Sequence, residues 1–405
     1  MSPVLQNAIE AAPALTDPVC SRWPHYDEDV ISEVSEVLRS GKVNALHHGH
    51  YCRAFERLFA ERCRVPYAIA LANGTLALEL ALRALDLGPG SEVIVPARSF
   101  MASASCVVAV GASPVFADVD RETQTLTAAT VAAALTPRTR AILVVHLAGW
   151  PAPMEELCAL ADAHDLRIIE DCAQAHGATL NGRPVGSFGD AAAFSFCTDK
   201  IISTGGEGGM VVTRRADVWR RSWSYKDHGK APDTPPRPSQ GTFRWLHESF
   251  GSNMRLTEMQ AAIGHHQLAK LDTMLAARRR NAAVLDEVLP GAPALRCTRL
   301  PTGIGHAFYK YYCFVRPDEL APGWSRDRIM AELLVHHIPC GSGSCPEIYL
   351  EQAFDGTPFR PLRRLPVARE LGETSLMFPV DPTLTEADML RIGEALRGVL
   401  AGAAR

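Results

Sequence analysis

Short apolar runs alternate with amphipathic stretches along the first two thirds of the chain. The runs AIALA, EVIVPA, PVFADV, AILVVH and LRIIED each have the length of a buried strand, and helical patterns separate them. Such alternation predicts an α/β fold with a mostly parallel sheet covered by helices on both faces. Before the first run, apolar residues at helical spacing predict a helix from Asp27 to Ser40, which Gly41 ends.

The last third of the chain has a different pattern. A long helix is predicted from Leu256 to Leu271, and an arginine-rich helix follows it. Beyond about Ala276, strands are predicted at YKYYCFV and SLMFPV, and helices at RDRIMAELLVHH and TEADMLRIGEALRGVL. Because 405 residues exceed what one hydrophobic core usually serves, we predict three parts. They are a loose N-terminal leader over 1–24, a large domain over 25–271 and a smaller α+β domain over 272–405.

Polar residues follow several of the predicted strands. Asn73, Arg98, His146 and Asp171 lie at or just after strand ends, and ligands of such sheets bind at the carboxyl ends of the strands. Arg98 is interpreted with equal weight as a substrate contact or as a surface charge. For His146 taken alone, a structural role is favoured.

The turn Asn73-Gly74-Thr75 joins a strand to the helix TLALELALRAL. Free N–H groups and the positive end of the helix dipole favour an anion at such a turn. Gly74 and Thr75 are therefore candidate phosphate ligands. The equally weighted alternative is that Thr75 only caps the helix.

The segment from Leu166 to Met210 carries the strongest chemical signal. Asp171 stands at the end of one apolar run, and Lys200 follows just after a second. Pyridoxal 5'-phosphate needs a lysine amine for a Schiff base and an acid that keeps its pyridine nitrogen protonated. Asp171 and Lys200 therefore predict this cofactor. The glycines after Lys200 match neither GxGxxG nor the Walker pattern, and we interpret them as tight turns.

The overall composition fits an ordinary globular enzyme and argues against several other classes. Apolar residues make up 47% of the chain and the net charge is −4, so there is no electrostatic footprint for nucleic acid. The run Arg278-Arg279-Arg280 is interpreted as a solvated helix face. No apolar run approaches the roughly 20 residues that span a bilayer. We expect neither membrane insertion nor secretion.

Cysteine and histidine usage predicts a cytoplasmic protein without a metal site. The eleven cysteines contain no CxxC pair, and reduced thiols fit a cytoplasm. A disulfide between Cys340 and Cys345 is the less favoured alternative. His47, His48 and His50 have no carboxylate or cysteine partner at ligand spacing, so a loop is predicted there.

Several blocks of the chain resemble one family, the DegT/DnrJ/EryC1/StrS aminotransferases that use pyridoxal phosphate. The main block is EDCAQAHGATLNGRPVGSFGDAAAFSFCTDK followed by GGEGGMVVT. The others are NGTLALELAL, GSEVIVPARSFMASA, VVHLAGWPAPMEEL, YKDHG and GSNMRLTEMQAAIGHHQLAKLD. The resemblance is dense from about Asp27 to Leu271 and thinner beyond. It implies the fold of aspartate aminotransferase, which is fold type I with a seven-stranded sheet. It also implies a homodimer with active sites at the subunit interface.

Matching the motifs residue by residue implies roles in cofactor chemistry. Lys200 resembles the lysine that forms the Schiff base, Asp171 the partner of the pyridine nitrogen and Gln174 the contact to the ring hydroxyl. Asp171 alone has the alternative of a helix cap. The chain departs from the family at Cys197-Thr198-Asp199, where relatives commonly carry histidine and proline. Asp199 beside Lys200 favours the charged form of its amine.

The remaining matches imply contacts to the phosphate and to the ring. Gly74, Thr75 and Ser195 resemble phosphate ligands, and Phe100 resembles the aromatic residue that stacks on the ring. Asn253 resembles the residue that reaches the phosphate of the other subunit. Taken singly, each of three residues has a structural interpretation that is preferred over cofactor binding. These are a strand hydroxyl for Ser195, a core residue for Phe100 and a turn former for Asn253. Taken together with the lysine, the cofactor set is preferred.

The resemblance implies an aminotransferase that uses small-molecule substrates. The donor is an amino acid, by resemblance L-glutamate. The first hypothesis for the acceptor is a nucleotide-linked keto sugar of polysaccharide or secondary-metabolite biosynthesis, and the second is a cyclitol ketone or a similar carbonyl precursor. A dehydratase of the same fold has histidine in place of Lys200, which argues against that activity. A non-catalytic regulator of this fold remains an alternative.

Overall fold

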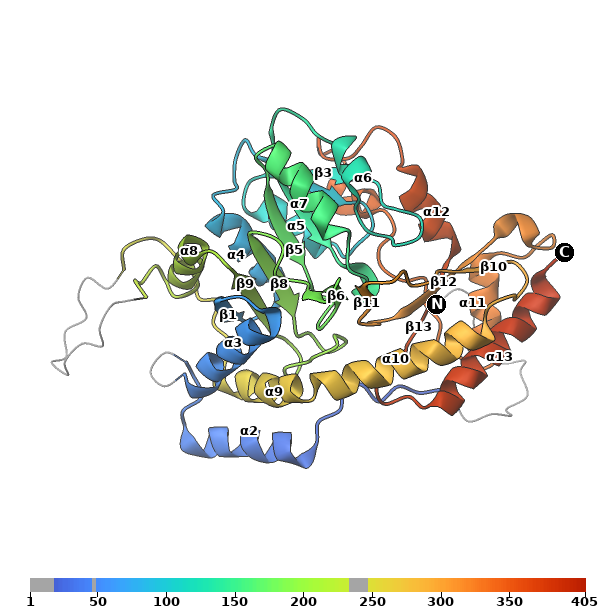
Figure 1. The fold of residues 1–405 in the computed structure, drawn as a ribbon, viewed down its shortest axis with the longest axis horizontal. Coiled ribbons are helices and arrows are strands. Elements are labelled where there is room, and N and C mark those ends of the chain that lie inside the picture. The colour runs from blue at the N-terminus through green and yellow to red at the C-terminus, as the bar shows by residue number, and fades with distance from the viewer. Residues whose placement is uncertain (1–17, 46–48, 233–246) are drawn as a thin grey trace.

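The fold is built around a seven-stranded, mostly parallel sheet. The computed structural model describes residues 18–45, 49–232 and 247–405. In sheet order the strands are β1 (Tyr67–Leu71), β9 (Gly209–Thr213), β8 (Ala191–Ser195), β5 (Arg167–Asp171), β4 (Thr139–Val145), β2 (Glu92–Pro96) and β3 (Ser113–Ala117). All neighbours are parallel except β9, which runs antiparallel to β1 and β8 (Figure 1). The predicted sheet is confirmed.

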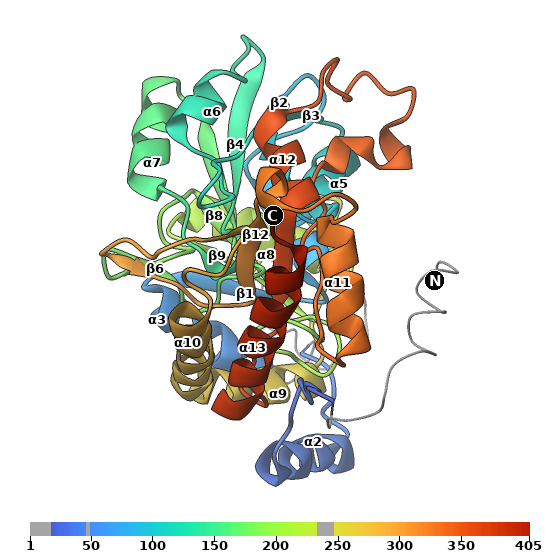
Figure 2. The ribbon, with the colours of Figure 1, turned by 90° about the vertical axis from the view of Figure 1, so that its right-hand side faces the viewer.

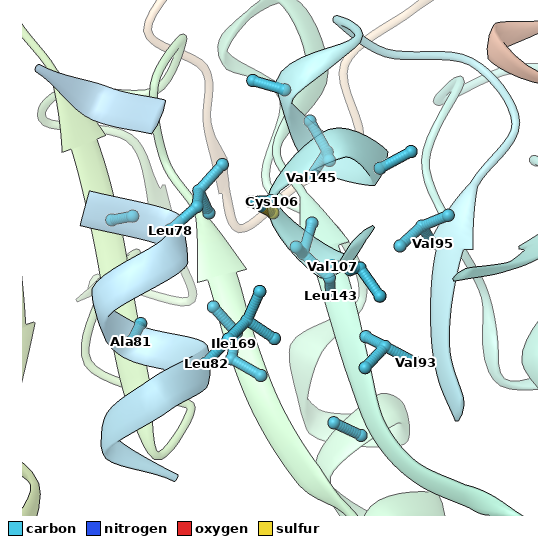
Figure 3. Packing of buried hydrophobic residues seen from close by; sticks show 14 of the residues in the cluster. Leu78, Ala81, Leu82, Val93, Val95, Cys106, Val107, Leu143, Val145 and Ile169 are labelled. Atoms are coloured by element: carbon cyan, nitrogen blue, oxygen red, sulfur yellow. The ribbon is translucent and has the colours of Figure 1, made fainter. Parts of the chain in front are cut away.

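Helices cover both faces of this sheet, because successive residues of a strand point to opposite sides. One face carries α4 (Gly74–Ala84), α5 (Ala102–Ala109) and α8 (Ala216–Lys226), and the other carries α3 (His50–Cys63), α6 (Ala128–Ala132) and α7 (Met154–Ala163). Figure 3 shows Leu78 of α4 and Val107 of α5 in the same cluster as Val93 and Leu143 of the sheet. Ile94, the neighbour of Val93, belongs to the core on the opposite face.

Three further helices continue from the side of the sheet that α3 covers. The predicted N-terminal helix is α2 (Glu28–Ser40), and it ends at Gly41, whose φ of 68° favours glycine. The helix predicted from Leu256 to Leu271 is α9 (Glu258–Ala269), which starts at a capping box. α10 (Leu271–Val288) follows directly and packs against α13 (Glu386–Ala403) in the C-terminal part (Figure 1).

The C-terminal part contains the predicted α+β elements. β10 (Leu295–Cys297), β12 (Tyr311–Val315) and β13 (Ser375–Phe378) form an antiparallel sheet, and α11 (Arg326–Val335) and α13 share its core (Figure 2). Short 3-10 turns lie at Leu147–Gly149, Pro317–Glu319, Ile348–Leu350 and Gln352–Phe354.

Two connections join this part to the large sheet. β11 (Ile304–Gly305) pairs with β6 (Thr179–Leu180), which pairs with β7 (Arg183–Pro184). Buried side chains of α12 (Pro366–Thr374) belong to the same hydrophobic core as residues of β2 and α5. The expected division between 271 and 272 therefore stays a prediction.

The described part of the expected leader is held in place. Residues 1–17 lie outside the described residues, as do His47 and His48 of the predicted histidine loop. Further along, the Trp23 indole N–H donates a hydrogen bond of 2.8 Å to the Lys200 carbonyl. The N-terminal segment thus reaches the candidate lysine.

The structure corrects one expected surface feature and bears on two others. Arg278 is only 1% exposed, so the predicted solvated face is wrong for this residue. Its guanidinium donates to the carbonyls of Phe308 and Tyr309 at 3.3 and 3.2 Å. All eleven cysteines are free, including Cys340 and Cys345. None of the described helices is long and apolar enough to cross a membrane.

His176 is buried among aromatic rings of the core. It is 1% exposed, and its ring centroid lies 5.4 Å from that of Phe194 and 5.6 Å from that of Phe196. Burial lowers the pKa of His176 to about 3, and the positive charge of Lys200 adds to this effect. The folded protein keeps the ring neutral in mild acid, whereas the unfolded chain protonates it.

We predict that the His176→Phe variant loses less stability than the wild type when the pH falls from 7 to 5. The folded-state pKa lies below the unfolded value of about 6.5, so stability falls as the pH drops through 6.5 towards 3. The contribution of this residue between pH 7 and pH 5 is about 2 kcal/mol. Urea unfolding of both proteins at the two pH values measures it. Equal pH dependence in wild type and variant would contradict the prediction.

Candidate active site

The carboxyl ends of β5 and β8 meet at one edge of the large sheet. β5 ends at Asp171, and this residue pairs with Ala193 of the neighbouring parallel strand β8, which ends at Ser195. Parallel strands bring their ends to the same edge. The loop after β8 therefore brings Lys200 close enough for its charge to act on Asp171.

Asp171 is a buried carboxyl group with two defined donors. It is 6% exposed, and it accepts hydrogen bonds from the Ser103 hydroxyl at 2.9 Å and from the Ala173 N–H at 3.1 Å. Burial raises the pKa of Asp171, while these hydrogen bonds and the charge of Lys200 oppose the rise. A cationic group bound beside this carboxyl would favour its anionic form.

A narrow cradle lies at the start of α4. The Asn73 side chain accepts the Leu76 N–H at 2.9 Å, so Asn73 caps the helix and the alternative that Thr75 does so is wrong. The N–H groups of Gly74 and Thr75 precede the first intrahelical bonds and remain available. A Cβ on Gly74 would lie 2.6 Å from the Cβ of Ser195. Only glycine allows this approach, and the arrangement suits a small anion.

Lys200 extends into the same region from the loop after β8. Its side chain is 16% exposed, and its Nζ lies 3.7 Å from Asp199 Oδ1 and 3.5 Å from the Tyr309 hydroxyl. The bond from Trp23 fixes its backbone. The chain turns tightly beyond it, with a φ of 78° at Gly205, as the glycine pattern predicted.

Gln174 is oriented by a backbone contact. It is 7% exposed, and its carboxamide oxygen accepts the Ala148 N–H at 2.7 Å. This contact leaves the NH2 group of the amide as the donor for a ligand. Gln174 therefore fits a contact to an oxygen atom.

Glu170 anchors this edge of the sheet through a saturated network. His146 Nδ1 accepts the Ala152 N–H at 3.0 Å, so its Nε2 donates to Glu170 at 3.0 Å, which confirms the structural role of His146. Glu170 also accepts three backbone N–H groups at 2.8 Å, from residues 186, 188 and 189. Burial alone raises the pKa of Glu170, but His146 and these donors hold it below its ordinary range.

The same network explains the nearby cluster of metal-type ligands. One ligand atom each of His146, Glu170 and Cys172 lies within 4.8 Å of the others. The carboxylate oxygens of Glu170 already accept four hydrogen bonds, and burial raises the pKa of Cys172 well above its ordinary value. This cluster is therefore structural.

Phe100 and Asn253 occupy different positions relative to the site. Phe100 follows β2 and is 66% exposed, so its ring is available to a ligand. Asn253 lies on the segment beside β1, where the Ala72 N–H donates to the Met254 carbonyl at 3.0 Å. Among the described residues, no hydrogen bond links Asn253 to the cradle of its own chain.

Arg98 joins two distant parts of the chain. It is fully buried, and its guanidinium donates to Gln124 at 2.9 Å and to Ser375 at 3.0 Å. The interpretation as a surface charge is wrong. The residue links the end of β2 to the start of β13.

Sequence reasoning missed two residues of the site. Ser103 donates a hydrogen bond to Asp171, and its hydroxyl forms a second hydrogen bond of 2.9 Å with the Ser99 hydroxyl. The two serines are four residues apart just after EVIVPA, and a helix brings residues at that spacing together, so the sequence contained a signal for this pair. Tyr309 lies more than a hundred positions beyond Lys200 in the sequence. No local pattern connects Tyr309 with Lys200.

The architecture defines the class of protein. A mostly parallel seven-stranded sheet with a smaller α+β part is the fold type I arrangement of pyridoxal-phosphate-dependent transferases, which the comparison with solved structures confirms. The sequence model of the DegT/DnrJ/EryC1/StrS aminotransferase family matches residues 24–397. The chain belongs to this family, and it is an aminotransferase.

Two relatives show the range of acceptors among similar proteins. A UDP-N-acetyl-3-dehydro-alpha-D-glucosamine 3-aminotransferase of Acidithiobacillus ferrooxidans is 39% identical over 375 residues, which are 93% of this chain and 95% of the relative. An L-glutamine:2-deoxy-scyllo-inosose aminotransferase of Streptomyces fradiae is 41% identical over 316 residues, which are 77% and 74%.

Two solved structures share the whole fold. An aminotransferase of Psychrobacter cryohalolentis has 50% identity and a TM-score of 0.91, and the match covers 94% of this chain and 99% of that one. A putative sugar aminotransferase of Streptococcus pneumoniae in its PMP form has 25% identity and a TM-score of 0.85, with coverage of 94% and 98%.

We predict that Gly74→Ala weakens the binding of pyridoxal 5'-phosphate by about five- to 150-fold. The added methyl group displaces Ser195 from the cradle or blocks the phosphate, a cost on the order of 1–3 kcal/mol. Absorbance titration of cofactor-free protein measures the affinity.

Gly398→Ala is the matched control. Gly398 lies within α13, and nothing lies within 4 Å of the position of its added Cβ. This variant should bind the cofactor as the wild type does. Equal affinities for Gly74→Ala and Gly398→Ala would contradict a phosphate cradle at Gly74.

Proposed function

We propose that this protein uses pyridoxal 5'-phosphate to move an amino group from an amino acid, L-glutamate, to the keto group of a nucleotide-linked sugar. The observation that carries the proposal is the placement of Asp171 and Lys200 at neighbouring strand ends, together with the Gly74 and Ser195 cradle. The PMP form of a family structure supports the cofactor.

The residues present fit this cofactor. The cradle of Gly74, Thr75 and Ser195 suits the phosphate, and the buried carboxyl of Asp171 suits a protonated ring nitrogen. Gln174 presents an NH2 donor for the ring hydroxyl. The exposed ring of Phe100 is available to stack on a flat ring.

Each residue then has a defined task. The cofactor supplies an electron sink. Asp171 holds the proton on the ring nitrogen, and burial strengthens this interaction. Lys200 takes the proton from the α carbon of the donor and returns a proton when the acceptor is aminated. The phosphate cradle, Gln174 and Phe100 would hold the cofactor in place beside Lys200.

A nucleotide-linked keto sugar is the preferred acceptor class. The relative named for a UDP-linked keto sugar matches 93% of this chain, whereas the one named for an inosose matches 77%. A cyclitol ketone is therefore the second candidate. The dehydratase alternative conflicts with Lys200. A purely regulatory role predicts no turnover of any acceptor.

A homodimer with shared active sites would cover exposed aromatic residues. Phe100 is 66% exposed, and Phe250, close to Asn253 in the sequence, is 98% exposed. A second subunit that covered them would remove apolar surface from water. The free cysteines support the expected cytoplasmic location, where thiols stay reduced.

Lys200→Ala should abolish amino transfer and the visible absorbance band of the Schiff base, because Lys200 supplies the amine for both. Turnover is measured with L-glutamate and a panel of nucleotide-linked keto sugars and cyclitol ketones. The wild type should favour the nucleotide-linked group. The exposed Lys42→Ala is the control and should keep activity. A Lys200→Ala protein that still turns over would refute the assignment.

Mixing two inactive variants tests the shared site. Lys200→Ala combined with an inactive Asn253→Ala should recover up to about a quarter of wild-type activity, because a symmetric dimer with one variant of each kind has one intact site. Activity is measured over a range of mixing ratios after subunit exchange. No recovery at any ratio would count against a contribution of Asn253 across the interface.

A further inference from the structure

A tyrosine and an aspartate surround the amine of Lys200. The Tyr309 hydroxyl donates a short hydrogen bond to Asp199 Oδ2 and lies 3.5 Å from Lys200 Nζ. Asp199 Oδ1 lies 3.7 Å from the same nitrogen. Lys200 Nζ also lies 4.9 Å from the centroid of the tyrosine ring. The two side chains present one anion, one hydroxyl and one aromatic face to the amine.

The backbone around Tyr309 is fixed from two directions. Its N–H donates to the Ala148 carbonyl at 2.9 Å, beside the backbone group that orients Gln174. Arg278 of α10 donates to the Tyr309 carbonyl at 3.2 Å. Tyr309 is 7% exposed. Its hydroxyl is therefore placed by rigid contacts rather than by a mobile loop.

The charges of this group are complementary. Burial alone raises the pKa of Asp199, but the charge of Lys200 and the hydrogen bond from Tyr309 bring it below its ordinary value. Burial and the neighbouring Asp199 raise the pKa of Tyr309, so it remains a neutral donor. The pair is thus suited to hold an ammonium group.

Other charged groups also act near Lys200. Asp171 faces it from β5. Lys310, next to Tyr309, is a second basic group, and burial lowers its pKa. His176 carries a pKa of about 3 and stays neutral. Asp199 is therefore the anion closest to the Lys200 amine that is not already assigned to the cofactor ring.

We propose that Asp199 and Tyr309 form a holding site for the Lys200 amine whenever it is not bonded to the cofactor. This inference rests on the proposed function. The pair keeps the released amine near the reacting carbon and stabilises it after it has taken up a proton. Both are positioning residues, because they act through Lys200. The Tyr309–Asp199 contact also makes the state of the lysine depend on the C-terminal part of the chain.

The test measures how readily the Lys200 amine reacts in the full-length, cofactor-free protein. Acetic anhydride acylates only the uncharged amine, and mass spectrometry of the Lys200 peptide gives its labelling rate relative to the exposed Lys42 between pH 6 and pH 10. Asp199→Asn should raise the rate at pH 8 by about three- to tenfold and move the pH profile to lower pH, since the anion that favours the charged amine is gone.

The second variant tests the tyrosine. Tyr309→Phe should raise the labelling rate by a smaller factor. The double variant should resemble Asp199→Asn, because the two residues act as one unit. A role limited to joining the two parts of the chain would lower the melting temperature and leave the pH profile of labelling unchanged.

The chain contains a matched control pair. The Tyr311 hydroxyl donates to Asp286 at 2.8 Å, a bond of the same kind two residues further along the chain, where β12 begins. Asp286→Asn and Tyr311→Phe should leave Lys200 labelling unchanged. Labelling of Asp199→Asn and Tyr309→Phe at the wild-type rate would overturn the inference. That result would leave the proposed function standing, because the latter is tested by Lys200→Ala and its substrates.

Discussion

The parallel pairing of β5 with β8 is the constraint on which the site depends. It places Asp171 beside Ala193, so the loop after β8 returns Lys200 to the same edge. Burying a carboxyl group in this position is costly, and the bonds from Ser103 and Ala173 offset part of that cost. The saturated Glu170 network immediately before Asp171 keeps the strand end rigid.

The site is completed by segments that are far apart in the sequence. Trp23 holds the backbone of Lys200, and Tyr309 with Asp199 holds its amine. Arg278 of the long helix α10 fixes the Tyr309 backbone, and Arg98 links the end of β2 to the start of β13. The part of the chain around the large sheet supplies the residues proposed to hold the cofactor, and Tyr309 of the C-terminal part contacts the lysine amine. Movement between the two parts would therefore change the contacts of the Lys200 amine.

The pattern of apolar residues predicted the strands of the large sheet, its mostly parallel character and the α+β elements that follow. It also separated α9 from the arginine-rich α10, and the predicted boundary at Leu271 lies next to the observed junction at Lys270. It misjudged Arg278 as an exposed charge, and for Arg98 it gave a surface charge the same weight as a substrate contact. Arginine is usually exposed, and only the packing of distant backbone carbonyls and side chains around these two groups makes their burial possible.

The sequence by itself determined the types and order of the elements, and it singled out Asp171 and Lys200 as the candidate pair for the cofactor, since periodicity and motif spacing are local properties. The tertiary structure alone decided which groups surround that pair. Ser103 became the partner of Asp171, and Tyr309 came to face Lys200. Such contacts depend on how separate segments pack, and the burial and charge that follow from packing are not encoded in any short stretch of the chain.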